Sequence, residues 1–343
     1  MTPLLRRRFV WVLRVAVMGG LLLGVAAQVQ WRAVGDALRA VQPLFLVLGV
    51  GAAAVGRWLG AYQMQLLLNR IGIAFSIGQV YVINLSAAFY ELFLPARVGG
   101  GMIRLYKFSQ PQRQWSEALA AMAFNRFLET LTLVGLGIVF WAASPHVPAR
   151  WVIGAVLLGL LAGMLALHGE AKHGVLRSLL GRWPAAKACQ ILLPATLRAA
   201  ADRVMGQAAR SYQEYRLVHA TALPVVGLSV AHHLLGIVSF VCLAHAIGIG
   251  APWWVFGWIR TVVALLTMLP ISVAGLGLRE GSLVLLLQPF GVDASEAVAL
   301  SLTVFALALI SGGAGGVVEL IRAVGASRPL NSSRAQRSRT AGP

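Results

Sequence analysis

Long apolar runs separated by short polar stretches divide the chain into eight segments. None of them alternates between apolar and polar residues, as the strands of a membrane barrel would. A helix needs about 20 apolar residues to cross a bilayer, and most of the segments reach that length. The pattern therefore predicts an all-α polytopic membrane protein, with apolar segments at residues 9–27, 44–68, 78–95, 116–142, 151–168, 221–247, 253–287 and 297–321.

Two of these segments, 78–95 and 253–287, run into the same short motif, in which an arginine follows a Leu-Pro pair at a fixed distance. The arginines are Arg104 and Arg279, and glycines cluster in front of each. Proline and clustered glycines interrupt helices, and interrupted helices at matching places in two halves are typical of transporters. We expect each segment to form a broken re-entrant hairpin, with the breaks at Pro95, Gly99, Gly100, Gly101, Pro270, Ser272, Gly275 and Gly277.

The basic residues predict how the chain crosses the membrane. If six segments span and both hairpins re-enter, one side receives 19 Lys and Arg residues and the other only three. Basic loops are retained in the cytoplasm, so both termini are expected there. The first half would then start inside and the second outside, which makes an inverted repeat. The predicted parts are a first membrane half at 1–142 with a hairpin near 78–108, a second half at 143–326 with a basic cytoplasmic connector at 169–220 and a hairpin near 253–287, and a disordered basic tail at 327–343.

Composition supports the membrane class. Hydrophobic residues make up 58% of the 343 residues, and charged residues only 12%. A net charge of +18 in a soluble protein would suggest nucleic acid as partner, but here the basic residues flank apolar spans, so we expect none. The two cysteines, Cys189 and Cys242, offer neither a disulfide framework nor metal-ligand spacing. The first apolar segment follows Arg6, Arg7 and Arg8 and is long enough to be an uncleaved helix rather than a signal peptide.

Seven arginines fall within or beside the apolar segments, with few carboxylates near them. A buried cation is costly unless it reaches water, a carboxylate or a bound anion, and the guanidinium fork suits a phosphate group. We predict a lipid headgroup site that involves Arg97, Arg104, Arg279, Glu280, Arg260, Arg126 and Glu129. For Arg14 and Arg57 we favour side chains that reach the membrane surface or pair internally.

Several residues allow more than one interpretation of their role. Arg126 and Glu129 are three residues apart on one helix face, so an internal ion pair is as reasonable as ligand contact. His232 and His233 could relay protons, but hydrogen bonds in the core are the simpler expectation. The glycines around Gly277 lack the strand and spacing of a nucleotide-binding loop.

Residues 269–302, LPISVAGLGLREGSLVLLLQPFGVDASEAVALSL, closely resemble the C-terminal signature of the lysylphosphatidylglycerol synthase transmembrane-region family, a flippase-like group. Pro270, Ser272, Gly275, Gly277, Arg279 and Glu280 match that pattern. Residues 94–108, LPARVGGGMIRLYKF, resemble the first signature of the family through Pro95, Gly99, Gly100 and Arg104. Gly101 stands where an acidic residue is usual, and Asn125-Arg126 with Glu129 resembles the following helix. The resemblance extends over residues 10 to 322.

The resemblance implies a protein of the plasma (inner) membrane that moves an anionic or phosphate-bearing lipid or lipid-linked precursor between leaflets. The alternative is a membrane enzyme, or a non-catalytic subunit, in the metabolism of aminoacyl-phospholipid, polyprenyl-sugar or hopanoid. No catalytic constellation, cofactor or metal site is expected from the residues. The expected partners are a membrane phospholipid or lipid-linked precursor and a lipid-synthesis enzyme.

Overall fold

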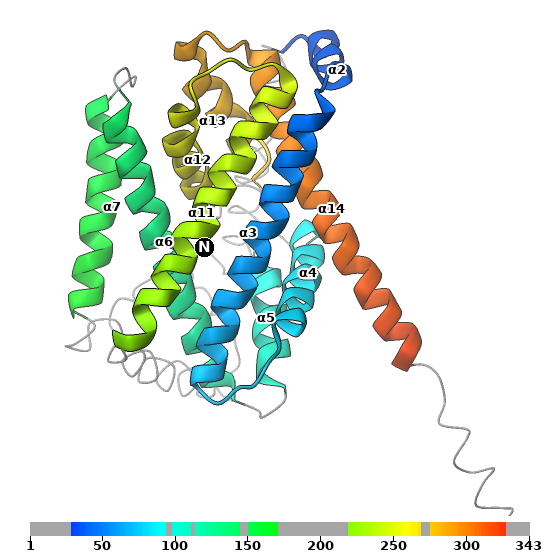
Figure 1. Ribbon diagram of the computed structural model, residues 1–343, viewed down its shortest axis with the longest axis vertical. Helices are drawn as coiled ribbons and strands as arrows, with labels where there is room; N and C mark the ends of the chain where they lie inside the picture. Colours follow the sequence, from blue (N-terminus) through cyan, green and yellow to red (C-terminus); the bar gives the residue numbers. More distant parts are fainter. Residues whose placement is uncertain are drawn as a thin grey trace, which may run out of the picture.

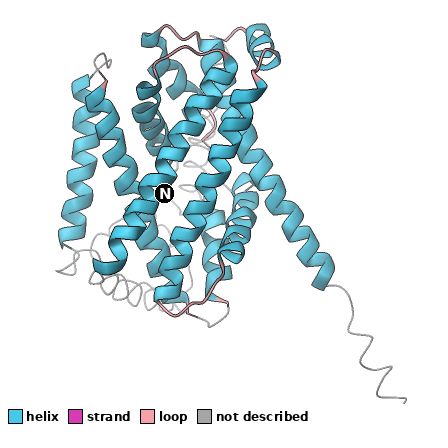
Figure 2. Cartoon of the chain, viewed as in Figure 1, coloured by secondary structure: helices cyan, strands magenta, loops and turns pink. Residues whose placement is uncertain are grey.

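The computed structural model describes residues 29–93, 98–110, 114–144, 150–170, 219–268 and 275–326, and within these ranges every regular element is a helix (Figures 1 and 2). The elements are α2 (Trp31–Arg39), α3 (Pro43–Arg70), α4 (Ile77–Phe93), α5 (Val98–Ser109), α6 (Trp115–Ala143), α7 (Arg150–Glu170), α11 (His219–Ile247), α12 (Trp253–Met268), α13 (Leu278–Leu287), the 3-10 turn η3 (Gln288–Phe290) and α14 (Ala294–Ala326).

The all-α membrane fold expected from the apolar runs is confirmed. Among the described residues, four helices are long and apolar enough to cross a membrane, namely α3, α6, α11 and α14. The apolar stretches Arg150–Met164 of α7 and Trp253–Met268 of α12 are shorter. The predicted first span at 9–27 and the tail at 327–343 lie outside the described residues. Of the predicted connector at 169–220, residues 171–218 also lie outside them, and its first and last two residues belong to α7 and α11.

Both motif segments are broken helices. The first consists of α4 and α5, and the second of α12 and α13. In Figure 1, α4 and α5 lie in the lower half of the bundle, and α12 and α13 lie in the upper half. The long helices α3 and α11 run past both pairs (Figure 1). The two broken segments therefore approach the middle of the molecule from opposite ends.

The breaks differ in their use of glycine. Gly275 and Gly277 have φ of +79° and +81°, a backbone conformation that glycine adopts without steric cost. Gly277 directly precedes Leu278, the first residue of α13. In the first motif the structure corrects our prediction, since Gly99, Gly100 and Gly101 lie inside α5 rather than in the break. Their small size serves helix packing there, as shown below for Gly100. The remaining predicted break residues, Pro95, Pro270 and Ser272, lie outside the described residues.

Close antiparallel packing joins the two halves. Along α3 and α11, the N–H of Gln42 donates to the Ala246 carbonyl at 2.8 Å, and Ser239 Oγ donates to the Gly49 carbonyl at 2.7 Å. A Cβ added at Gly315 of α14 would overlap the Leu85 carbonyl of α4. Likewise, a Cβ at Gly137 of α6 would overlap the Thr261 side chain of α12. Each half therefore packs the first arm of its own broken segment against the last helix of the other half.

Two apolar cores surround the two broken segments. One core includes Phe256, Trp258 and Leu283 from α12 and α13, and the other includes Leu67, Ile83 and Phe108 from α3, α4 and α5. The two cores hold the broken segments in place and leave polar side chains between them.

At the start of α14, the backbone N–H of Ser295 donates to the Asp293 carboxylate at 3.0 Å, which holds the pKa of Asp293 below its ordinary value.

Candidate functional site

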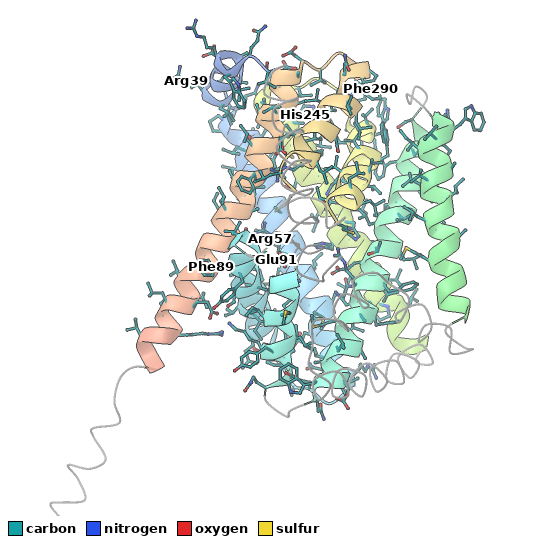
Figure 3. All side chains as sticks on the ribbon, turned by 180° about the vertical axis from the view of Figure 1, so that it is seen from behind. Arg39, Arg57, Phe89, Glu91, His245 and Phe290 are labelled. Carbon is teal, nitrogen blue, oxygen red and sulfur yellow. The ribbon has the colours of Figure 1, made fainter. Side chains whose placement is uncertain are left out.

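A cavity of about 830 Å³ lies between the two cores. Helices from both halves line it, including all four arms of the broken segments. Arg57 and Glu91, which belong to its lining, are labelled at mid-height of the bundle in Figure 3. The charged residues on its wall are Arg57, Arg104, Arg126, Arg260, Arg279, Glu91 and Glu129.

The cavity brings together most of the predicted site residues. Arg104 and Arg279, which the sequence places in two distant motifs, face the same space, and Gly101 lines it as well. Glu280 does not line the cavity but pairs with Arg279. Arg97 lies outside the described residues. Convergence of the two motif arginines on one cavity is the arrangement that an anion site between the halves requires.

Arg279 is held by a buried network. Its Nη2 lies 2.7 Å from Glu280 Oε1, and its Nε donates to Ser301 Oγ at 2.7 Å. Ser301 Oγ in turn donates to Glu280 Oε1 at 2.7 Å, and the Gly277 N–H donates to Glu280 Oε2 at 2.6 Å. The guanidinium also lies over the ring of Phe305, 5.1 Å from its centroid. The charge of Arg279 is thus compensated locally, and the group is fixed at the start of α13.

Arg104 has its own carboxylate. Its Nη2 lies 3.1 Å from Oε1 of Glu91, which projects from the other arm of the same broken segment. The close approach depends on Gly100, because a Cβ at that position would overlap the Glu91 side chain. Arg104 Nε is buried without a hydrogen-bond partner among the described residues. The pair therefore joins α4 to α5, and Arg104 Nε remains without a partner among the described residues.

Arg126 and Glu129 form the internal ion pair that was one of two expectations, with Nη1 and Oε2 3.7 Å apart. Asn125 Nδ2 donates to Glu129 Oε1 at 2.9 Å, and Gln63 Nε2 donates to Asn125 Oδ1 at 2.8 Å. Both members of the pair also line the cavity, so pairing and ligand contact are compatible here. The chain of contacts fixes α6 against α3.

The two histidines hydrogen-bond in the core, in line with the simpler expectation. His232 Nδ1 lies 2.7 Å from the Gly56 carbonyl, and His233 Nε2 lies 2.8 Å from the Glu129 carbonyl. Both bonds join α11 to helices of the first half. His232 also lines the cavity, at the contact between α11 and α3.

Arg57 and Arg260 differ from the other three arginines. In the part of the chain that the structure describes, neither has a carboxylate within 4.0 Å. Arg260 Nη1 is buried and has no hydrogen-bond partner there. Arg57 lines the cavity, whereas the sequence favours a side chain that reaches the membrane surface or pairs internally. A Cβ added at Gly56 or Gly60 of the same helix would lie in van der Waals contact with α11, so α3 and α11 pack closely beside Arg57.

A further ionic contact lies outside the cavity. Lys107 of α5 pairs with Glu319 of α14, and Arg322 lies 3.9 Å from the same carboxylate. This contact connects the first broken segment to the last helix outside the cavity. No group of three His, Cys, Asp or Glu side chains that could hold a metal occurs among the described residues.

Comparison with known proteins places the chain in a family. No curated protein matches it. The family model for the lysylphosphatidylglycerol synthase TM region matches residues 11–316, which include both broken segments and every described cavity residue. The match confirms the resemblance noted from the two motifs, and with the apolar helices it makes this a multi-pass membrane protein. The chain therefore belongs to the lysylphosphatidylglycerol synthase TM region family.

Proposed function

We propose that this protein moves an anionic, phosphate-bearing lipid or lipid-linked precursor between the leaflets of the plasma (inner) membrane. The observation that carries the proposal is the cavity between the halves, whose described lining includes five arginines and two glutamates. Cations at that depth are costly unless an anion is near, and phosphate oxygens match the guanidinium fork. The family is named after a membrane region of a lipid synthase, which agrees with a lipid as ligand.

The arrangement of the halves supports a mechanism by alternating exposure. The packing of α4 on α14 has its counterpart in the packing of α12 on α6, as expected of an inverted repeat. Rocking of one half against the other about the α3–α11 contact would open the cavity first to one leaflet and then to the other. The basic ends of α3 and α14, at Arg70 and Arg322, favour the lower end in Figure 1 as the cytoplasmic side.

The test is movement of lipid by the full chain reconstituted into vesicles. Fluorescent phosphatidylglycerol in the inner leaflet should become accessible to a membrane-impermeant quencher faster than in protein-free vesicles. Arg260→Gln should slow this movement by tenfold or more, because it removes a cation from the cavity wall. Arg39→Gln, at an exposed arginine of α2, is the matched control and should behave as the wild type. Equal rates with and without protein would contradict the proposal.

The second candidate is a membrane subunit that presents lipid to a lipid-synthesis enzyme, and the name of the family favours it. In that case the purified chain would bind lipid without moving it. Binding together with unchanged leaflet exchange in the same vesicles would therefore select this candidate.

A further inference from the structure

We propose that Arg57 and Arg260 form the headgroup subsite of the cavity, and that the headgroup carries two negative charges on phosphate, as in a phosphomonoester or a diphosphate. This inference rests on the proposed function, since it assumes that a lipid enters this cavity. In this inference the main contacts to the headgroup come from Arg57 and Arg260 rather than from the two motif arginines, Arg104 and Arg279.

The charges already matched within the protein point to these two residues. Three of the five cavity arginines have a carboxylate of their own, in the pairs Arg104–Glu91, Arg126–Glu129 and Arg279–Glu280. Arg57 and Arg260 are the cavity arginines without one in the described ranges. The segments 94–97 and 269–274, which join the arms of the broken helices, contain one basic residue, Arg97, and no acidic residue. Once the three pairs are counted, two of the described arginines on the cavity wall have no carboxylate partner among the described residues.

Arg260 has a donor available for a ligand. Its Nη1 is buried without a partner among the described residues, and its guanidinium lies against Gly236 of α11, where a Cβ would overlap Nη2. A buried donor that stays unpaired costs free energy, so a ligand that accepts this hydrogen bond would be bound more tightly. The absence of a side chain at Gly236 provides the space in which the guanidinium lies.

Arg57 and Arg260 reach the cavity from different helices. Arg57 belongs to α3 and Arg260 to α12, one from each half, and both lie on the cavity wall. The guanidinium of Arg260 lies against Gly236 of α11, and His232, about one turn earlier on the same helix, also lines the cavity. A headgroup in the cavity can therefore accept hydrogen bonds from both halves.

The number of negative charges on the ligand follows from the two arginines that have no carboxylate partner. A phosphodiester lipid carries a single negative charge and would leave one of the two cations unmatched. A phosphomonoester carries between about −1.5 and −2 at neutral pH, and a diphosphate linkage carries two charges, so either balances both arginines. Each arginine can then donate to a charged oxygen, and such bonds are about twice as strong as neutral ones.

The experiment compares two soluble lipids that differ in charge, with the full chain in a non-ionic detergent. The probes are dioctanoyl phosphatidic acid, a phosphomonoester, and dioctanoyl phosphatidylglycerol, a phosphodiester. At pH 8 the monoester should bind about tenfold more tightly, because it makes one more charge-assisted contact. Geranyl diphosphate is the third probe and should also outcompete the diester. Titration calorimetry or competition for a labelled lipid measures the affinities.

Lowering the pH from 8 to 5 tests the charge directly. The second ionisation of a phosphomonoester lies near pH 6, so its advantage should shrink at pH 5, whereas the charge of the diester does not change. The diester also reports on the protein's own titration, because other ionisable groups share the cavity wall. These are Tyr81 and Glu91 of α4, Arg104 of α5, Arg126 and Glu129 of α6, His232 of α11 and Arg279 of α13.

The variant Gly236→Ala tests the subsite without removing a charge. The added methyl group displaces the end of the flexible Arg260 side chain, so folding should be retained while the preference for the monoester falls several-fold. Gly227→Ala on the same helix is the matched control, because a Cβ there meets nothing within 4 Å. The double variant Arg57→Gln with Arg260→Gln should abolish the preference.

Each outcome has one meaning. Equal affinity for monoester and diester, with both weakened in the double variant, overturns the two-charge inference but leaves the proposed function intact. A monoester preference that survives the double variant overturns the assignment to Arg57 and Arg260. Failure of the wild type to bind any of the three probes overturns both this inference and the proposed function.

Discussion

Each of the three paired arginines in the cavity lies beside its own carboxylate, so removing one partner leaves the other charge without its match. Arg279 and Glu280 are the most enclosed of these pairs, with side chains 10% and 7% exposed. Arg57 and Arg260 lack such a partner among the described residues. The two groups of arginines should therefore respond in opposite ways to substitution.

Arg279→Ala should destabilise the protein by about 3 kcal/mol, because it leaves Glu280 buried without a cation. Arg260→Ala should leave stability unchanged or raise it in the absence of lipid, because it removes a buried cation that no described carboxylate matches. Thermal unfolding in lipid-free detergent measures both effects. Equal losses for the two variants would contradict the division into paired and unpaired arginines.

Gly101→Asp should weaken binding of anionic lipid. Gly101 lines the cavity, and a Cβ there meets nothing within 4 Å, so a carboxylate can be added without a steric clash. Its negative charge would offset one cation of the wall and should lower the affinity about tenfold, as expected for a charged contact. Gly101→Asn adds nearly the same volume without charge and should keep most of the affinity in the same binding assay.

At the scale of the helices, contacts between the halves rely on glycine where two backbones approach closely. The contact between α14 and α4 is the closest of these, with Gly312, Gly315 and Gly316 facing Leu92, Leu85 and Phe89. Two of these glycines, Gly312 and Gly316, are four residues apart and form a small-residue pair on one face of α14. Their role is packing, since small residues let helices in a membrane approach each other.

Gly315→Ala should destabilise the fold by about 1 to 3 kcal/mol, because the added methyl group would overlap the Leu85 carbonyl, a backbone atom that cannot turn aside. Gly313→Ala, two residues earlier on the open face of α14, should have little effect, because a Cβ there meets nothing within 4 Å. Thermal unfolding of the two variants in parallel provides the comparison. A similar stability for both would show that α14 does not pack on α4 in this way.

At the scale of the whole molecule, the two broken segments approach one cavity from opposite ends, and α2 lies at the end opposite to the last residues of α3 (Figure 1). If basic loops are cytoplasmic, Arg70 at the end of α3 lies inside and Arg39 at the end of α2 lies outside. This orientation is a prediction from charge.

A cysteine introduced by Arg39→Cys should react with a membrane-impermeant thiol reagent in intact cells, and one introduced by Arg70→Cys should react only after the membrane is opened. Cys189 and Cys242 are first replaced by Ser, which removes the background from the native thiols. The reverse pattern of labelling would invert the topology and place both termini outside.

The apolar runs alone predicted the long helices that the structure describes, because twenty apolar residues in a row have few other stable arrangements in a bilayer. The ends of α3, α6 and α11 lie within two residues of the predicted ones. The short helix α2 was not predicted, since nine residues with a polar average give no membrane signal. The repeated motif likewise identified the two broken helices and the arginines on their second arms, Arg104 of α5 and Arg279 of α13.

Ion pairs could be predicted from the sequence only where the two partners are near neighbours in the chain. Arg279–Glu280 and Arg126–Glu129 could be anticipated because one and three residues separate the partners. The pair Arg104–Glu91 depends on how α4 packs against α5, and the place of Arg57 on the cavity wall depends on how the helices pack together. The sequence determined which cations lie within or beside the apolar segments. The tertiary structure decided which of them are already neutralised, because ion pairing depends on distances of a few ångströms between helices far apart in the chain.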